Sequence, residues 1–264
     1  MAFCDWSSDV CSSDLPEEAR KTINAWVEQK TDQKIKDLIA PGALTPDFRL
    51  VLVNAIYFKG KWADQFDARR TQPMEFHLDA NRKKSVPMMQ RRGDYGFRET
   101  EDTQILELPY DGDRLSMVVL LPKDVNGLAA LEEKLTRDNV AAWLSKLPKE
   151  EATVFLPKFK ITWGAFDLKG PLQALGMKDA FVEKVADFSG MDGTRNLFIG
   201  FVLHKAFVEV NEEGTEAAAA TGIGMTTTSV RKSYVFRADH PFVFLIRDRQ
   251  TDSILFMGRV TDPG

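Results

Sequence analysis

The sequence has little cysteine and little histidine, and each shortage removes a class of site. Its only cysteines are Cys4 and Cys11, so the rest of the 264-residue chain can form no disulfide framework and no thiolate metal site. Its three histidines, His77, His204 and His240, are too far apart for the paired ligands of a zinc protease helix. We expect no metal and no cofactor, and we expect His77 and His240 to be structural.

Long apolar runs and an excess of basic charge are also missing. The longest apolar runs, residues 118–121 and 242–246, are far shorter than the ~20 residues that a membrane-spanning helix needs. Asp and Glu number 39 against 35 Lys and Arg, which gives a formal net charge of -4. A chain with no basic excess is a poor candidate for binding nucleic acid. We expect neither a membrane nor a nucleic acid among its partners.

The composition that remains is that of an ordinary globular domain. Hydrophobic residues make up 44% and charged residues 28%, and a chain of this length buries roughly 75% of its unfolded surface. The opening stretch, residues 1–15, differs, because it contains a near repeat (SSDV, then SSDL) without helical or strand periodicity. It also lacks the basic start and apolar stretch of a signal peptide. We expect residues 1–15 to be a foreign or disordered tail and residues 16–264 to form the domain.

Hydrophobic periodicity predicts runs of strands and runs of helices. Helices are expected at residues 16–30, 128–147 and 168–175. Strands are expected at residues 48–58, 153–161, 202–211, 241–246 and 254–260, with several more between 71 and 121. Residues 91–94 (RRGD) and 111–113 (DGD) predict turns between strands. Such runs, in place of strict alternation, indicate the α+β class.

One segment breaks these rules. On propensity alone, residues 215–221 should form a helix because of the alanines at 217–220, yet they follow a predicted strand directly. A glycine- and threonine-rich stretch, residues 222–229, comes next. A compact domain with roughly twenty residues of structureless chain contains either a functional loop or a wrongly assigned element. Gly222 and Gly224 form no nucleotide-binding fingerprint, because no helix or acidic partner follows them at the needed spacing.

The same loop carries the alternation of a strand. One face of such a strand would hold only small residues, which are Thr215, Ala217, Ala219 and Thr221. Glu216 has the opposite parity and would stay in water. Small side chains let a segment enter a packed sheet at little steric cost, whereas bulky or charged side chains on that face would slow the entry.

Several motifs, in order along residues 16–264, resemble the serpins, the serine protease inhibitor family. They are residues 54–62 (NAIYFKGKW), 107–110 (ELPY), 156–159 (LPKF), 210–221 (VNEEGTEAAAAT), 239–242 (DHPF) and 256–260 (FMGRV). The resemblance implies an α+β fold of mixed and antiparallel sheets with helices and an exposed reactive loop at about residues 214–233. It also implies that the fold is incomplete at the N-terminus.

The resemblance implies an inhibitor of serine-type endopeptidases and no enzyme. The serine of the target protease would attack a bond in the loop and form an acyl-enzyme. The loop would then insert into the main sheet between the strands at residues 51–58 and 202–211, so the inhibitor is a suicide substrate. The hinge of this motion would be Glu212, Glu213, Gly214, Thr215, Glu216, Ala217, Ala218, Ala219, Ala220 and Thr221. The alternatives are a non-inhibitory serpin that serves as a binding or carrier module, and an inactive truncated fragment.

The resemblance also places the cleaved bond. Spacing from Gly214 gives Thr228–Ser229, whereas counting back from the closing strands gives a bond near Val230. Thr228 or Val230 would suit an elastase-, chymotrypsin- or subtilisin-like protease, and Arg231 would suit a trypsin-like one. We favour Thr228–Ser229.

Four further residues resemble a sheet-opening site. Asn54 and His204 resemble a hydrogen-bonded pair where the main sheet opens, although His204 is equally well explained as a satisfied core histidine. Lys158 and Glu212 resemble an ion pair beside Trp62 at the top of the sheet. The alternative is a surface pair worth at most ~1 kcal/mol, with Trp62 a plain core residue.

The sequence carries weaker signals for binding partners, oligomeric state and cellular location. Basic clusters at residues 82–84 and 91–92 could bind a polyanion, but a solvated strand edge is the favoured interpretation. We expect the full-length parent to be a monomer and to be extracellular or periplasmic, with a cytoplasmic location left open. The strand at residues 51–58 lacks an outer neighbour, so we expect this chain alone to be unstable or prone to aggregate.

Overall fold

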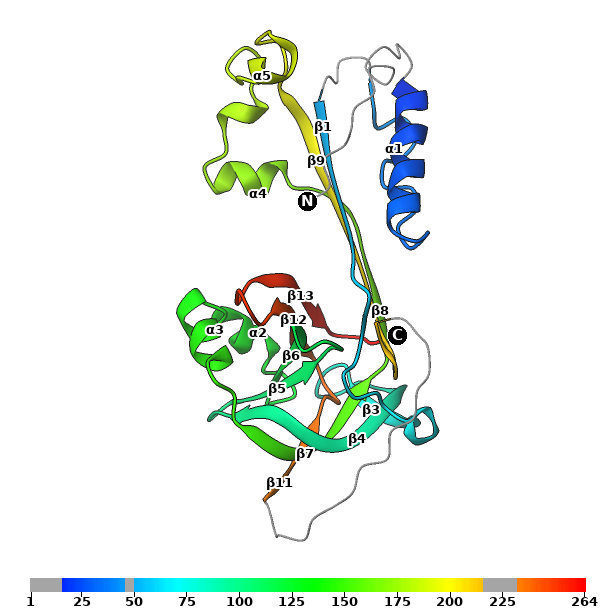
Figure 1. Cartoon of the computed structure of the whole chain (residues 1–264), viewed down its shortest axis with the longest axis vertical. Helices are drawn as coiled ribbons and strands as arrows, with labels where there is room; N and C mark the ends of the chain where they lie inside the picture. The colour runs from blue at the N-terminus through cyan, green and yellow to red at the C-terminus, as the bar shows by residue number, and fades with distance from the viewer. Residues whose placement is uncertain (1–15, 46–49, 216–231) are drawn as a thin grey trace. The chain divides into compact units, whose positions relative to one another are not determined.

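The computed structural model describes residues 16–45, 50–215 and 232–264 (Figure 1). These fall into two units. Unit 1 is formed by Met1–Phe58 with Ile161–Val208, and unit 2 by Lys59–Lys160 with Glu209–Gly264. The expected tail (residues 1–15), the hinge residues 216–221, the glycine pair at 222–224 and the bond Thr228–Ser229 with its neighbours 230 and 231 lie outside the described residues.

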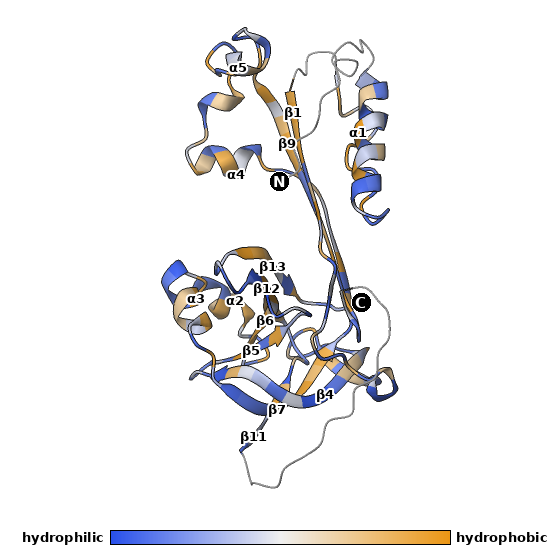
Figure 2. Cartoon of the chain, in the orientation of Figure 1, coloured by the Kyte–Doolittle hydropathy of each residue, from blue (hydrophilic) through white to orange (hydrophobic). Residues whose placement is uncertain are grey.

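Unit 1 begins with the expected helix, α1 (Pro16–Lys30), whose first turn carries Glu17 and Glu18. The helix is amphipathic, as Figure 2 shows by its two colours. Its apolar face packs with residues 35–39, which follow it, and with Phe207. The Asn24 amide donates to the Ile39 carbonyl and accepts from the Ile39 amide, each at 2.9 Å. These bonds fix the chain that follows α1 against the helix.

The sheet of unit 1 has three strands in the order β1-β9-β8. They are β1 (Leu50–Tyr57), β8 (Phe159–Asp167) and β9 (Ile199–Val210). The segment between β8 and β9 holds three short helices, α4 (Lys169–Ala174), η2 (Asp179–Phe181) and α5 (Ser189–Asp192). A small apolar cluster joins the sheet to this segment, through Leu50, Ile199, Val202 and Phe181.

Unit 2 is built on an eight-stranded sheet with the order β11-β7-β4-β5-β6-β12-β13, and β3 pairs with β4. The strands are β3 (Gln72–His77), β4 (Lys83–Glu99), β5 (Thr103–Pro109), β6 (Leu115–Pro122), β7 (Lys149–Pro157), β11 (Ser233–Arg237), β12 (Phe242–Asp248) and β13 (Ile254–Val260). Neighbours are antiparallel except β11 and β7, which are parallel. Smaller elements complete the unit: β2 (Gly60–Lys61), η1 (Ala68–Arg70), α2 (Leu128–Glu133), α3 (Arg137–Leu144) and β10 (Gly214–Thr215).

The core of unit 2 lies between this sheet and the two helices α2 and α3. Alternate residues of β5, β6 and β12 face the helices and pack with Leu131, Val140 and Leu144. The alternation follows from strand geometry, because successive side chains point to opposite faces. All seven residues of β12 are buried, so this strand is covered on both faces.

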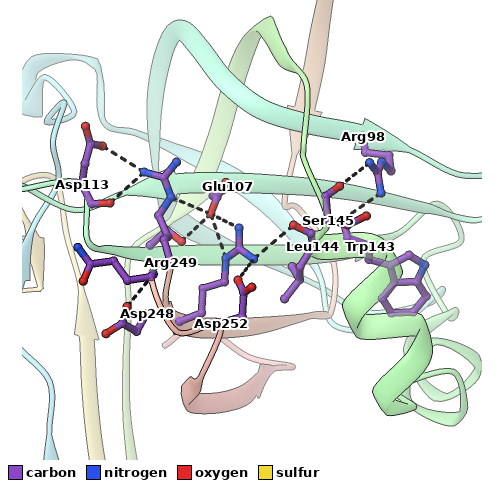
Figure 3. A network of polar contacts seen from close by, with 12 residues as sticks. Arg98, Glu107, Asp113, Trp143, Leu144, Ser145, Asp248, Arg249 and Asp252 are labelled. Atoms are coloured by element: carbon purple, nitrogen blue, oxygen red, sulfur yellow. Dashed lines mark hydrogen bonds and ion pairs between the residues drawn. The ribbon is translucent and has the colours of Figure 1, made fainter.

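A buried polar network ties these elements together (Figure 3). Glu107 Oε1 accepts a hydrogen bond from Ser116 Oγ at 2.7 Å and from Arg247 Nη2 at 2.7 Å. The side chains of Arg247 and Glu107 are only 8% and 9% exposed. Arg98 donates to the carbonyls of Ala142 at 2.6 Å and Ser145 at 2.8 Å, which caps the end of α3.

Two sequence-based predictions in unit 2 are wrong. Residues 91–94 form no turn and lie inside β4, where residues 88–96 pair with β7. Pairing with a neighbouring strand overrides the local preference of Gly and Asp for turns. The helix expected at residues 128–147 is two helices, because Thr136 is extended and its hydroxyl accepts from the Asn139 amide, which starts α3. The turn at residues 111–113 is confirmed by positive φ angles at Gly112 and Asp113.

Candidate functional site

The strands between which insertion was expected are directly paired. β1 and β9 run parallel, and their register is continuous from Val51↔Phe201 to Tyr57↔Phe207. Any strand that enters between them must first break this row of hydrogen bonds. The slot is therefore closed in this structure.

Asn54 lies opposite His204 in this register. The expected hydrogen bond between their side chains is absent among the described residues, and His204 Nδ1 is buried without a partner. The imidazole ring lies against Trp163, with ring centroids 5.3 Å apart. His204 is thus no satisfied core histidine. Trp163 was not anticipated, and only its place on the third strand of this sheet could have indicated it.

Lys158 and Glu212 come together in unit 2. Lys158 Nζ lies 2.9 Å from Glu212 Oε2, and Thr71 donates its hydroxyl to Glu212 Oε1 at 2.8 Å. Burial disfavours the charged form of Glu212, but the hydrogen bonds from Lys158 and Thr71 outweigh it, and the pKa of Glu212 is lowered. The Glu212 side chain is 13% exposed and that of Lys158 38%. The pair is thus more buried than the surface alternative assumed.

Trp62 holds the backbone that leads into the hinge. Its indole Nε1 donates to the Asn211 carbonyl at 3.0 Å, and its amide donates to the Glu213 carbonyl at 2.9 Å. Its ring stacks on Tyr110 with centroids 4.6 Å apart and planes at 9°. The amide of Phe66 donates to the Glu212 carbonyl at 2.8 Å. Trp62 is 3% exposed, but these polar contacts make it more than a plain core residue.

Gly214 is tightly constrained by the backbone that faces it. It has a φ of +132°, and a β-carbon there would lie 2.2 Å from the Gly60 carbonyl oxygen. β10 pairs with β2, with Gly214 opposite Lys61. No side chain fits so close to the neighbouring backbone, so the start of the loop is fixed only because this residue is glycine.

The other end of the loop is also fixed. β11 pairs in parallel with β7, from Ser233↔Glu151 to Arg237↔Phe155. Residues 216–231 therefore join two anchored strands of unit 2, β10 and β11. We call residues 211–214 the hinge anchor below.

The basic clusters and the remaining histidines have local partners. The cations at residues 82–84 form ion pairs with Asp79, Glu75 and Asp262, and Arg91 and Arg92 pair with Asp64 and Glu151. Such paired charges fit the solvated strand edge and not a polyanion site. His240 Nε2 lies 2.6 Å from the Pro122 carbonyl, and the His77 backbone amide donates to the Asp239 carbonyl at 2.7 Å. A structural role for the two histidines stays a prediction.

The described part of the chain offers neither a metal site nor a membrane-spanning helix. No group of three or more His, Cys, Asp or Glu residues there could hold a metal ion. No helix there is long and apolar enough to cross a membrane.

Comparison with known proteins gives a consistent result. The family model described as Serpin (serine protease inhibitor) matches residues 7–263. The chain is 48% identical over 251 residues to Serpin B8 of Bos taurus, which covers 94% of the chain and 67% of the relative. It is 45% identical over 269 residues to the leukocyte elastase inhibitor of Bos taurus, covering 98% of the chain and 71% of the relative.

Solved structures match the same fold. Uncleaved ovalbumin aligns with a TM-score of 0.82 at 34% identity, over 96% of this chain and 64% of that one. Serpin48 of the insect Tenebrio molitor aligns with a TM-score of 0.83 at 37% identity, over 96% and 66%. The expected α+β class is thereby confirmed. The chain spans about two thirds of the length of the relatives it matches.

Proposed function

The chain belongs to the serpin family, and from that premise we propose that it inhibits serine endopeptidases as a suicide substrate and is not an enzyme. The anchoring of the loop supports this most directly. The hinge anchor is held by amides of residues 62 and 66 and by the indole of Trp62, and β11 holds the other end. The segment that carries the proposed bond is thus joined at both ends to strands of unit 2.

The proposed reaction begins in the loop. The serine of the target protease attacks the Thr228 carbonyl, the Thr228–Ser229 bond breaks, and Ser229 leaves with a free amine while Thr228 stays on the enzyme as an ester. The freed loop then enters between β1 and β9. Since β1 and β9 are parallel, a segment that turns back after β9 runs antiparallel to both, which is the more stable pairing.

Opening requires specific contacts to break. The β1–β9 hydrogen bonds must separate at Asn54 and His204, and the Lys158–Glu212 pair and the Trp62 contacts must release the hinge anchor. We propose these four residues, Asn54, His204, Trp62 and Lys158, as the sheet-opening site. The small residues of the hinge, Thr215 to Thr221, would then enter the sheet.

The residue before the proposed bond indicates the class of the target protease. We propose an elastase-, chymotrypsin- or subtilisin-like target because of Thr228, and one relative is named for leukocyte elastase.

The comparisons give no support to an extracellular or periplasmic location, so we propose the cytoplasmic alternative. With Cys4 and Cys11 outside the described residues, no disulfide holds the described part together, as expected for folding in a reducing compartment. Cell fractionation tests this, and secretion into the medium would contradict it.

The test of inhibition is direct. The purified chain is mixed separately with pancreatic elastase, subtilisin and trypsin, and the products are resolved on denaturing gels. We expect a heat- and detergent-stable complex with elastase or subtilisin, and a released peptide that begins at Ser229. A released peptide that begins at another residue would show that the cleaved bond precedes that residue instead.

A matched hinge variant makes this test specific. Ala219→Arg keeps the loop length and puts a charge on the inserting face, so we expect cleavage at the same bond without a complex. Clean cleavage of the unmodified chain, again without a complex, would contradict inhibition by this chain and favour one of the two alternatives, a non-inhibitory serpin or an inactive truncated fragment.

A further inference from the structure

A short segment of unit 2, residues 62–66, lies between the hinge anchor and the large sheet. Its two end residues bind the hinge anchor. The Trp62 amide and indole donate to it at 2.9 and 3.0 Å, and the Phe66 amide donates to it at 2.8 Å. The residues between them are bound to the sheet instead, since the Ala63 amide donates to the carbonyl of Pro109 at the end of β5 at 2.9 Å. We call residues 62–66 the clamp segment.

Arg91 of β4 binds the middle of the clamp segment. Its Nη1 donates to the Asp64 carbonyl at 2.7 Å, and its Nη2 lies 3.0 Å from Asp64 Oδ1. A guanidinium carries its N–H donors in a rigid fork, so one side chain can reach both the backbone and the carboxylate of the same residue. Arg91 therefore fixes the backbone of the clamp segment against β4.

Burial distinguishes Arg91 from Arg92, its neighbour in the basic cluster. The Arg91 side chain is 23% exposed and that of Arg92 63%. The Arg91 guanidinium carbon lies 5.9 Å from the ring centroid of the buried Tyr95. Successive residues of a strand point to opposite faces, and Arg92 pairs with Glu151 of β7 instead of with the clamp segment. A solvated strand edge thus accounts for Arg92, whereas Arg91 is packed into the fold.

These contacts form a chain from β4 through Arg91 and the clamp segment to the hinge anchor. When the hinge anchor opens locally, the clamp segment must still be in place for the same hydrogen bonds to form again. A clamp segment that can move away would let the hinge anchor stay open longer. The side chain that holds the clamp segment therefore influences how easily the loop is released, although it does not touch the hinge anchor in any contact described above.

We propose that Arg91 is a positioning residue for release of the loop: it holds the clamp segment in place and, through it, the hinge anchor. The consequence for inhibition rests on the proposed function. The hold of Arg91 on the hinge anchor can be measured without a protease.

The first experiment compares amide hydrogen exchange in Arg91→Ala and Arg92→Ala, with no protease present. Arg91→Ala should speed exchange at the amides of Trp62 and Phe66 about tenfold, and Arg92→Ala should leave both unchanged. Exchange in β12 should be unchanged in both variants. Equal exchange of the two clamp amides in the two variants would overturn the proposal. A rise that extends to β12 would show that Arg91 only stabilises the unit as a whole, which would overturn it too.

Two milder variants keep the test decisive if Arg91→Ala does not fold. Arg91→Lys keeps the positive charge but loses the fork, and Asp64→Asn loses the carboxylate charge but keeps the backbone carbonyl. Each should speed exchange at the clamp amides by about threefold, which is less than the effect of Arg91→Ala. Native exchange in both milder variants would overturn the proposal.

The second experiment adds pancreatic elastase or subtilisin and counts the chains cleaved for each stable complex formed. Earlier release of the hinge lets insertion compete better with deacylation, so Arg91→Ala should lose fewer cleaved chains per complex than the native chain and than Arg92→Ala. The same ratio in all three would overturn the role of Arg91 in release. If the native chain forms no complex, inhibition by this chain is contradicted, and the exchange experiment alone then decides whether Arg91 holds the hinge anchor.

Discussion

The sheets of the two units are held together in different ways. In unit 2, β12 is buried along its whole length and its Arg247 forms a buried ion pair with Glu107. In unit 1, most of β8 is exposed, including Trp163 at 44% and Phe166 at 47%. The unit 1 sheet also contains a buried ring nitrogen without a partner, His204 Nδ1. The sheet that holds the second end of the loop through β11 contains a fully buried strand and a buried ion pair, whereas β8 of the sheet proposed to open is mostly exposed.

The hinge anchor resembles the sheet of unit 2, because most of its polar groups have hydrogen-bond partners. Its backbone carbonyls at residues 211–213 each accept a hydrogen bond, and Glu212 has two side-chain partners. One exception is Glu213, whose buried Oε2 has no partner. The comparison teaches that burial and buried ion pairs distinguish the two sheets, whereas buried polar atoms without a partner occur in both units, at His204 in unit 1 and at Tyr95 and Glu213 in unit 2.

The largest expected effect is at the buried pair of unit 2. Arg247→Ala leaves Glu107 charged, buried and short of its main partner, which should lower the free energy of unfolding by about 3–5 kcal/mol. Urea denaturation measures this. A loss below about 1 kcal/mol, as for an exposed pair such as Lys83–Glu75, would remove the contrast between the two sheets.

The next effect is at Gly214. Gly214→Ala should cost about 3 kcal/mol, because it adds a clash with Gly60 to the strain of a positive φ. The matched control is Gly112→Ala, which has a φ of +81° but nothing within 4 Å of a β-carbon, so only about 1 kcal/mol of strain is expected. Hydrogen exchange at the amides of Trp62 and Phe66 should rise in Gly214→Ala alone. Equal exchange in the two variants would mean that the hinge anchor does not depend on close packing.

A smaller effect concerns pH. The pKa of Glu212 is lowered in the folded chain, so its contribution to stability is present above the ordinary value of 4.5 and is lost as the pH falls through the folded pKa. Glu212→Gln should cost about 1 kcal/mol at neutral pH and flatten the fall in stability below pH 4.5. Urea midpoints across that range measure this. If the stability of the variant falls as steeply as that of the native chain, groups other than Glu212 cause the acid sensitivity.

The smallest effect is at the unsatisfied histidine. His204→Leu removes a buried nitrogen that has no partner, so stability should be unchanged or rise by up to about 1 kcal/mol. Urea denaturation of the variant and of the native chain measures this difference in stability. A loss above 1 kcal/mol would show that His204 stabilises the closed slot in a way that its Nδ1 environment does not indicate.

The last two strands were predictable because each is a short apolar run bounded by polar residues. β12 and β13 lie close to the predicted ranges 241–246 and 254–260. β4 was split by a false turn, because the glycine and aspartate at residues 93 and 94 carry a local signal that pairing with β7 overrides. Sequence reports local preference, and pairing between distant segments decides the outcome.

The same limit applies to the site. The resemblance brought Lys158 to Glu212, but not Thr71, which reaches Glu212 across 141 residues of sequence. A lone threonine before a strand carries no signal of that contact. Trp163 was missed for the same reason, since its contact with His204 depends on two strands that meet only in the fold.

Trp62 gives the molecule an optical property. Its indole is stacked on Tyr110 and hydrogen-bonded to the Asn211 carbonyl, whereas Trp163 is 44% exposed. Release of the hinge anchor would free the indole N–H and change the polarity around the ring. Its fluorescence emission would then move to longer wavelength as the loop departs. The chain has five tryptophans, so a stopped-flow fluorescence trace of a variant in which the other four are replaced by phenylalanine would report Trp62 alone and would time the release of the hinge anchor.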